Sequence, residues 1–392
     1  MSQGLKNTSA RLIAFYLPQF HPIPENDEWW GKGFTEWINV AKAKPLFRGH
    51  YQPRLPADLG FYDLRVPEVR EAQAELARNA GIEGFCYYHY WFAGKLLLER
   101  PFSEVVSSGK PDFPFCLCWA NQTWTGVWHG ASNRTLIAQT YPGADDHRKH
   151  FLSLLDAFLD SRYMRVEDCP IFVIYRPSEI PNVTAFIKQW QDLAIQNGLP
   201  GLHFVAHLPD QESSWDYSSR GFDSCVVVSP LKVFRASVRN LFGHAAKNRS
   251  QDNGNLLSAS AIGHDLQGEL SHWLWRRSRT TMGKFGNVRL YRHALRFMLE
   301  GCNGQAHVCP CVVPNWDNTA RSGTRGYVLH DSTPELFRAH LRDALALVEG
   351  CPIDQRLVFI KSWNEWAEGN YLEPDQEFGG DYLRVVQEEI FR

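Results

Sequence analysis

Two carboxylates three residues apart stand just after a short apolar run near the C-terminus. The run covers residues 356–363 and is followed by Asn364, Glu365, Trp366, Ala367, Glu368 and Gly369. On an extended strand Glu365 and Glu368 would point to opposite faces, whereas a turn of helical pitch would place both on one face. Trp363 and Trp366 would add low-dielectric walls, which raise the pKa of one carboxyl while the other stays ionised. We therefore predict a catalytic pair, with a surface turn of two solvated glutamates as the alternative.

Aromatic residues are frequent in this 392-residue chain, which holds 14 Trp, 14 Tyr and 24 Phe. Many of them fall in polar, Gly- and Pro-rich stretches where core packing has no obvious need for them. Flat apolar rings edged by hydrogen-bonding groups suit the faces of sugars. The formal net charge of −2 offers little attraction for nucleic acid or an acidic membrane. We therefore expect an oligosaccharide or polysaccharide substrate and no nucleic-acid partner.

Eight short apolar runs recur along the chain, at 12–20, 82–91, 113–121, 170–177, 203–208, 223–230, 307–316 and 356–363. Helix-start and helix-stop residues frame segments 67–80, 145–162, 182–197 and 334–349, and 381–391 would be a closing helix. This alternation predicts an α/β fold, a (β/α)8 TIM barrel in a single domain over 1–392. An open doubly wound sheet is the alternative, although the glycine fingerprint of a dinucleotide site is absent from the sequence.

Two insertions, at about 19–66 and 231–305, interrupt the regular spacing, and we expect both at the C-terminal face of the barrel. Long loops in compact domains are usually functional, and the first insertion is predicted to form a wall of the pocket. The second is polar and basic, with Arg276, Arg277 and Arg279 near Trp273 and Trp275. It fits a lid, a partner surface or a helical elaboration, and a solvated basic face is an equal alternative.

Polar or aromatic residues stand at the ends of seven of the eight runs. Because the working face of such a barrel lies at the carboxyl ends of its strands, these groups would converge on one pocket. The predicted substrate-binding residues are Tyr16, Trp30, Trp37, His89, Tyr90, Trp91, Trp119, Asn121, Trp124, Asp317 and Asn364. We expect the tryptophans to form stacking walls and the others to orient hydroxyls or the carboxylates. Each residue alone fits a packing role equally well.

The nine cysteines contain no metal-binding pattern. Cys116 and Cys118, like Cys309 and Cys311, are two apart in strand-like runs, so each pair shares one sheet face as small core residues; a zinc site is the less favoured alternative. The first ten residues lack the apolar core of a signal peptide, and no run reaches the roughly 18 apolar residues needed to span a bilayer. We expect a cytoplasmic protein with no transmembrane segment, no metal and no other cofactor.

Several segments together resemble WbsX-type proteins, which carry a glycoside hydrolase family 99-like domain and are associated with lipopolysaccharide and O-antigen assembly. The similar segments are 15–21, 29–31, 34–37, 88–92, 94–95, 118–121 with Trp124, 316–319 and 364–369. They cover nearly the whole chain in the same order, with few recognisable motifs in 140–305. The resemblance implies a (β/α)8 barrel and sugar chemistry, without metal or nucleotide cofactor in the hydrolase branch.

By the same likeness, Glu365 would hydrogen-bond or deprotonate a sugar 2-hydroxyl as that oxygen attacks the anomeric carbon. Glu368 would be the general acid to the leaving oxygen and then the base towards water. The resemblance thus implies a retaining, α-mannosidase-like glycoside hydrolase or transglycosidase acting on bacterial polysaccharide. A glycosyltransferase of O-antigen biosynthesis is the first alternative, with residues 276–279 as a diphosphate site. A non-catalytic carbohydrate-binding barrel is the second.

Overall fold

Eight parallel strands close into a barrel in the computed structural model, which describes residues 8–126, 134–209, 214–235, 287–302 and 307–392. The strands are β1 (Arg11–Tyr16), β2 (Gly84–Phe92), β4 (Phe115–Trp119), β8 (Cys169–Ile174), β9 (His203–Pro209), β10 (Ser224–Val228), β12 (Val308–Val312) and β15 (Leu357–Ile360). Each pairs in parallel with the next in chain order, and β15 pairs with β1 to close the ring. The predicted (β/α)8 barrel is confirmed.

The strand sequences are apolar because both faces of the barrel wall are covered. In β10 all five residues are buried, and in β8 all but Cys169 are. Parallel strands with helices outside and packed side chains inside read as continuous apolar runs rather than alternating ones. Inside the barrel, the ring of Phe15 stacks on Tyr88 at 5.6 Å and on Phe359 at 5.3 Å between centroids. The interior below the strand ends is therefore a packed core.

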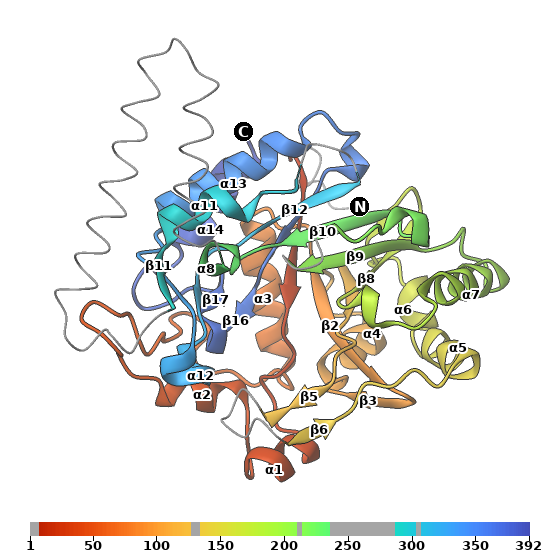
Figure 1. Ribbon diagram of the computed structural model, residues 1–392, viewed down its shortest axis with the longest axis horizontal. Coiled ribbons are helices and arrows are strands. Elements are labelled where there is room, and N and C mark those ends of the chain that lie inside the picture. The colour runs from red at the N-terminus through yellow and green to blue at the C-terminus, as the bar shows by residue number, and fades with distance from the viewer. Residues whose placement is uncertain (1–7, 127–133, 210–213, 236–286, 303–306) are drawn as a thin grey trace.

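Helices surround the barrel (Figure 1). They are α3 (Pro67–Asn79), α4 (Arg100–Ser108), α5 (Ala144–Ser153), α6 (Leu155–Leu159), α7 (Val183–Gln196), α11 (Tyr291–Met298), α13 (Pro334–Val348) and α14 (Asp381–Ile390). Asn182 caps α7 and Thr333 caps α13, since their side chains accept hydrogen bonds from the N–H groups of Ala185 and Leu336. These caps satisfy backbone donors that a helix leaves open at its start.

One predicted helix is divided. The segment 145–162 forms α5 and α6, separated at Leu154. The N–H of Leu154 bonds the carbonyl of Phe151, three residues back, and the hydroxyl of Ser153 bonds the carbonyl of His150 at 2.7 Å. A tightened turn and a side chain that competes for a backbone acceptor both interrupt the α-helical ladder.

Short elements from distant parts of the chain gather at the carboxyl end of the strands. The first insertion contains α1 (Pro24–Trp30) and α2 (Glu36–Lys42), β12 leads to β13 (Trp316–Asp317) and α12 (Thr319–Ser322), and β15 leads to β16 (Asn364–Glu365) and η8 (Trp366–Glu368). Both α2 and α12 contact η8. Figure 1 shows α1, α2 and α12 at one end of the barrel, together with the hairpin of β5 (Trp124–Thr125) and β6 (Thr135–Ile137). This end is therefore where a site can draw on several segments.

The remaining short elements are β3 (Lys95–Leu97), β7 (Arg165–Val166), α8 (Lys232–Arg235), β11 (Val288–Leu290), β14 (Val328–His330) and β17 (Asn370–Tyr371), with 3-10 turns at Pro177–Glu179, Ser218–Arg220, Gly323–Arg325 and Ile353–Gln355. Of the second insertion, α8, β11 and α11 are described. The basic cluster of Arg276, Arg277 and Arg279 lies outside the described residues.

All nine cysteines are free thiols, and Cys116, Cys118, Cys309 and Cys311 are buried in β4 and β12, as predicted. In the ranges that the structure describes, there is no group of three or more His, Cys, Asp or Glu side chains arranged to hold a metal ion. Among the helices of those ranges, none has the length and apolar character needed to cross a bilayer.

We predict that Thr333→Ala lowers the free energy of unfolding by about 1 kcal/mol, because α13 loses the acceptor for its first N–H groups. Urea unfolding followed by circular dichroism measures the difference. Thr333→Ser keeps the hydroxyl and serves as the control, with stability close to that of the natural chain. Equal stability of the Ala and Ser variants would contradict the capping role.

Candidate active site

A pocket of about 510 Å³ opens at the carboxyl ends of the strands. The strand ends contribute Leu17, Gln19, Tyr88, Tyr90, Gln122, Thr123, Trp124, Tyr175, Arg176, His207, Pro230, Asn318, Arg321, Lys361, Glu365 and Glu368. The first insertion contributes Asn26, Trp30, Phe34 and Glu36. The strand ends thus converge on one pocket, and the first insertion forms part of its wall, as expected from the sequence.

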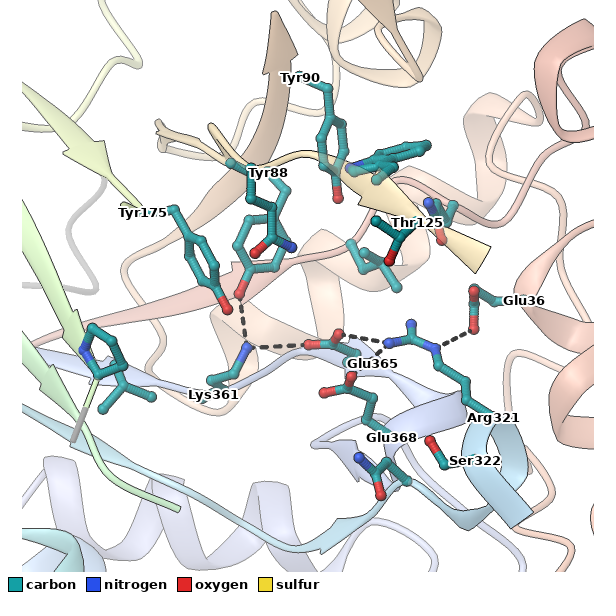
Figure 2. A pocket seen from close by; sticks show the side chains of 18 of the residues that line it. Glu36, Tyr88, Tyr90, Thr125, Tyr175, Arg321, Ser322, Lys361, Glu365 and Glu368 are labelled. Atoms are coloured by element: carbon teal, nitrogen blue, oxygen red, sulfur yellow. Dashed lines mark hydrogen bonds and ion pairs between the residues drawn. The ribbon is translucent and has the colours of Figure 1, made fainter. Parts of the chain in front are cut away.

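Glu365 and Glu368 lie side by side in the pocket because the chain turns between them. Glu365 ends β16 and leads into the 3-10 turn η8, in which residues three apart share one face. Their exposed fractions are 6% and 7%. Nη1 of Arg321 donates to Oε1 of both, over 3.4 Å to Glu365 and 2.6 Å to Glu368 (Figure 2). Two buried carboxyls therefore meet at one cationic nitrogen.

Arg321 and Lys361 connect a larger charge cluster. Nε of Arg321 donates to Oε2 of Glu36 over 3.0 Å. Nζ of Lys361 donates to the hydroxyl of Tyr88 over 2.8 Å and to Oε2 of Glu365 over 3.3 Å. Among the described residues, the ion pairs of these three carboxyl groups are all with Arg321 and Lys361 (Figure 2). One proton on a carboxyl would leave the cluster electrically neutral.

The two glutamates have opposite pKa shifts. Burial by itself raises the pKa of Glu365, but the charges of Lys361 and Arg321 outweigh burial and lower that pKa below its ordinary value. Burial, and then the charge of Glu365, raise the pKa of Glu368 to about 7 despite the ion pair with Arg321. The two values separate because Lys361 and Arg321 prevail over burial at Glu365, whereas burial and the charge of Glu365 prevail at Glu368. Near neutral pH Glu365 is ionised while Glu368 titrates, which matches a base and an acid.

Gly369 ends η8 in a position that excludes any side chain. Its φ is +53°, in the left-handed region that glycine tolerates best. A Cβ at this position would lie 2.9 Å from both Cβ and the carbonyl oxygen of Asp317, and 3.0 Å from Nε of Arg54. The turn that carries Glu368 is therefore pressed directly against the loop that follows β12.

Asp317 anchors that loop. It is fully buried, with Oδ2 lying 2.7 Å from Nε2 of His50 and accepting from Nε2 of Gln52 over 2.8 Å. Its Oδ1 accepts from the N–H and hydroxyl of Thr319 over 3.1 Å and 2.5 Å. Thr319 begins α12, and α12 carries Arg321. Asp317 thus ties the first insertion to the element that presents Arg321 to the glutamates.

Five of the thirteen residues predicted from the sequence line the pocket: Glu365, Glu368, Trp30, Tyr90 and Trp124. Trp124 meets Tyr90 edge-on at 5.0 Å between ring centroids. Trp30 belongs to α1, so the first insertion and the β5–β6 hairpin together present aromatic surface to the pocket.

Four of the predicted substrate-binding residues face the outside of the barrel: Tyr16, His89, Trp91 and Trp119. Side chains alternate along a strand, so Tyr88 and Tyr90 reach the pocket while His89 and Trp91 turn outward. Nε2 of His89 lies 2.8 Å from Nε2 of His150 on α5, and the ring of His150 stacks on Trp91. Trp119 donates to the carbonyl of Trp91, and Tyr16 donates to Gln73 on α3. The structure does not bring these four to the pocket; they attach helices to the barrel.

The other four, Trp37, Asn121, Asp317 and Asn364, lie behind the pocket wall. Nε1 of Trp37 donates to the carbonyl of Tyr62, and its ring packs on Trp366. The Asn121 amide bonds both N–H and carbonyl of Arg176, and the Asn364 amide bonds both N–H and carbonyl of Leu17. Each of the two Asn side chains ties a neighbouring strand end in place, so these residues support the site rather than line it.

Four pocket residues were not predicted: Glu36, Tyr88, Arg321 and Lys361. Lys361 precedes Glu365 by four residues, and Tyr88 alternates with Tyr90, so both had a local signal. Glu36 lies in segment 34–37 of the family resemblance, but no local pattern indicated its ion pair with Arg321, which joins residues 285 positions apart in the chain. Only the folded chain brings that pair together.

A family model described as Glycosyltransferase WbsX matches residues 12–386. The chain belongs to the WbsX family. The resemblance seen in the sequence is thereby confirmed. Two curated relatives, the WxcX proteins of Xanthomonas campestris pv. campestris strains B100 and ATCC 33913, are each 38% identical over 384 residues, which is 98% of this chain and 50% of the relative. The WbsX-family chain therefore spans about half the length of these curated relatives.

Two solved structures share the architecture of this WbsX-family barrel. One is a glycoside hydrolase-like protein with a TM-score of 0.56, 14% identical, with coverage of 98% of this chain and 95% of that one. The other is a GH99 endo-α-mannosidase from Bacteroides thetaiotaomicron in complex with bis-tris-propane, with a TM-score of 0.53, 14% identity and coverage of 97% and 95%. At this level of identity, these likenesses concern the fold alone.

We predict that Gly369→Ala destabilises the chain more than Gly379→Ala does. The two glycines share nearly the same φ, +53° and +54°, but a Cβ at 369 would overlap Asp317, whereas nothing lies within 4 Å of one at 379. The left-handed backbone costs both variants about 1–2 kcal/mol, and overpacking adds about 1–3 kcal/mol at 369 alone. Urea unfolding of the two variants in parallel measures the difference, and equal destabilisation would contradict the close packing at Gly369.

Proposed function

We propose that this chain is a retaining glycosidase, or a transglycosidase with the same machinery, that acts on α-mannoside-type linkages of bacterial polysaccharide. The observation that carries the proposal is the pair Glu365 and Glu368, buried together on Nη1 of Arg321 with their pKa values shifted in opposite directions. Two carboxyls in different protonation states at one place are what acid/base cleavage of a glycosidic bond requires.

In the proposed first step, ionised Glu365 accepts the proton of the sugar 2-hydroxyl while that oxygen bonds to the anomeric carbon. The bond from this carbon to the leaving oxygen breaks, and Glu368 gives its proton to the leaving oxygen. In the second step Glu368 takes a proton from water, or from an acceptor hydroxyl, whose oxygen attacks the anomeric carbon and opens the three-membered ring. Glu365 returns its proton to the 2-oxygen. Two inversions give net retention, without the direct carboxylate attack of the usual retaining scheme.

Two further features support this proposal. The charge of Lys361 favours the ionised form of Glu365, the form that accepts a proton. Trp30, Phe34 and Trp124 add apolar rings to a pocket that is also lined by hydrogen-bonding and charged groups. The pocket volume falls within the range of roughly 300–1,000 Å³ typical of ligand sites. A lining that combines apolar rings with polar groups suits a sugar, which has C–H faces and hydroxyl edges.

The description of the family as a glycosyltransferase favours a second candidate. In a transferase, the sugar would come from a nucleotide- or lipid-linked donor, and Glu368 would act as the base that deprotonates the acceptor hydroxyl. This candidate requires an activated donor, whereas a glycosidase acts on the glycan alone.

A mass-spectrometric time course separates the two candidates. The chain is incubated with bacterial O-polysaccharide or α-mannoside oligosaccharides, first without any activated sugar and then with nucleotide- or lipid-linked donors. Shortened or rearranged glycans in the first incubation support the glycosidase. Glycans that stay intact until a donor is added overturn it in favour of the transferase.

We predict that Glu368→Gln lowers kcat about 10²- to 10⁴-fold, the usual contribution of a general acid, while the chain stays folded. Glu349→Gln, on the exposed surface after α13, is the matched control and should leave the rate unchanged. The rate is measured with the oligosaccharides of the time course, and circular dichroism checks the fold. Full activity of the Glu368→Gln variant would remove Glu368 from the mechanism.

We predict a bell-shaped pH profile of kcat/KM with its basic limb at about 7, where the Glu368 pKa lies. Glu368 must be protonated, so activity falls as the pH rises through that pKa. Glu365 must be ionised, so the acidic limb lies below the ordinary glutamate pKa. The charge of Lys361 lowers the pKa of both groups, and its loss in Lys361→Met should therefore move both limbs to higher pH. Limbs that stay in place in this variant would contradict the assignment.

A further inference from the structure

Arg321 presents one nitrogen that the carboxyl cluster does not use. Nε bonds Glu36, and Nη1 bonds both Glu365 and Glu368. Within the described part of the chain, Nη2 has no hydrogen-bond or ion-pair partner. This nitrogen is also not fully buried, so a ligand can reach it. Figure 2 shows the guanidinium with one nitrogen outside the dashed lines, on the side of the pocket where Tyr90 and Thr125 lie in this view.

The direction of Nη2 is set by the other two nitrogens. A guanidinium is planar and carries its N–H groups in a rigid fork, so fixing Nε and Nη1 also fixes Nη2. The backbone that carries Arg321 is held as well, because Asp317 bonds Thr319 at the start of α12 and Arg321 belongs to that helix. The side chain of Arg321 is only 10% exposed, and Arg321 lines the pocket. A cationic donor is thus aimed at the space beside both glutamates.

We propose that Nη2 of Arg321 donates a hydrogen bond to a hydroxyl of the sugar unit that lies between Glu365 and Glu368, and that Glu36 is the positioning residue for this contact. The inference rests on the proposed function, because it assumes that this sugar unit is the one attacked. Arg321 is then a substrate-binding residue, and Glu36 acts through it from the first insertion.

The charges of the cluster indicate which sugars this position takes. Three carboxyl groups pair with two cations, so the cluster itself has no excess positive charge to offer an anion, and Arg176 and Arg325 line the pocket outside it. A carboxylate or phosphate on Nη2 would add negative charge beside Glu36, Glu365 and Glu368. A neutral hydroxyl accepts a charge-assisted hydrogen bond without that repulsion. We therefore assign a neutral, hydroxyl-bearing sugar to this position.

The test uses α-linked mannobiosides that each lack one hydroxyl, with the natural chain, Arg321→Lys and Glu36→Gln. In the natural chain, removal of the contacted hydroxyl should lower kcat/KM about 10- to 100-fold, the usual worth of a hydrogen bond to a charged group. Arg321→Lys keeps the charge but not the fork, so the same deoxygenation should cost it less than about threefold. A purely structural role of Arg321 would lower all substrates equally and single out no hydroxyl.

Glu36→Gln keeps Arg321 but loses its charged partner on Nε, so the selective loss for that hydroxyl should shrink towards the Arg321→Lys value. It also carries the test alone if Arg321→Lys fails to fold, as judged by circular dichroism. If every deoxygenated substrate loses the same factor in the natural chain and in the variants, the contact is absent and the inference is overturned. A full selective loss in Glu36→Gln would overturn the positioning role of Glu36.

Failure of the proposed function gives a different result. If the natural chain cleaves none of the mannobiosides, the glycosidase proposal fails, and the same set is compared by binding with isothermal titration calorimetry. Weaker affinity for one deoxygenated sugar in the natural chain, but not in Arg321→Lys, still supports the contact. Uniform affinities, or no binding at all, overturn it.

Discussion

The bond from one guanidinium nitrogen of Arg321 to two buried carboxyl groups is the interaction on which the site depends. Removing one partner from a buried ion pair costs about 3–5 kcal/mol, because the remaining charge is left without water or a counter-ion. The fold must therefore deliver Arg321, Glu365 and Glu368 together. It does so with α12, which follows β12, and η8, which follows β15, while α2 adds Glu36. The placement of these charged groups therefore depends on α2, α12 and η8 meeting at the carboxyl end of the barrel.

Much of the surrounding polar chemistry supports these segments without lining the pocket. Asp317 holds α12 to the first insertion, Asn364 holds the turn at η8 to the end of β1, and Asn121 holds the end of β4 to that of β8. Burying a polar group costs free energy unless hydrogen bonds replace those it made to water. The side chains of Asp317, Asn364 and Asn121 make such bonds, and these bonds hold the loops rigid. A rigid frame holds Arg321, Glu365 and Glu368 in a fixed arrangement, which is the geometric condition for catalysis at such a site.

Two causes separate the pKa values of the two glutamates. The charges of Lys361 and Arg321 outweigh burial at Glu365, and Lys361 also bonds that carboxyl directly. At Glu368, burial and the charge of Glu365 outweigh the same two cations. Among the described residues, the ion pairs of Glu36, Glu365 and Glu368 with Arg321 and Lys361 leave this cluster without surplus positive charge.

The sequence by itself indicated the barrel, the helical turn after Trp363 and the two glutamates, because each has a signature in residue patterns within short segments. Local patterns predict these features from neighbouring residues alone. They are the apolar runs of strand length, caps such as Asn182 and Thr333, and the three-residue spacing of the glutamates. Only the tertiary structure decided which of two adjacent strand residues faces the pocket, since Tyr88 and His89 differ by the register in which the barrel closes. It also decided the ion pair of Glu36 with Arg321 and the pKa of Glu368, because burial and charges from distant segments exist only after folding.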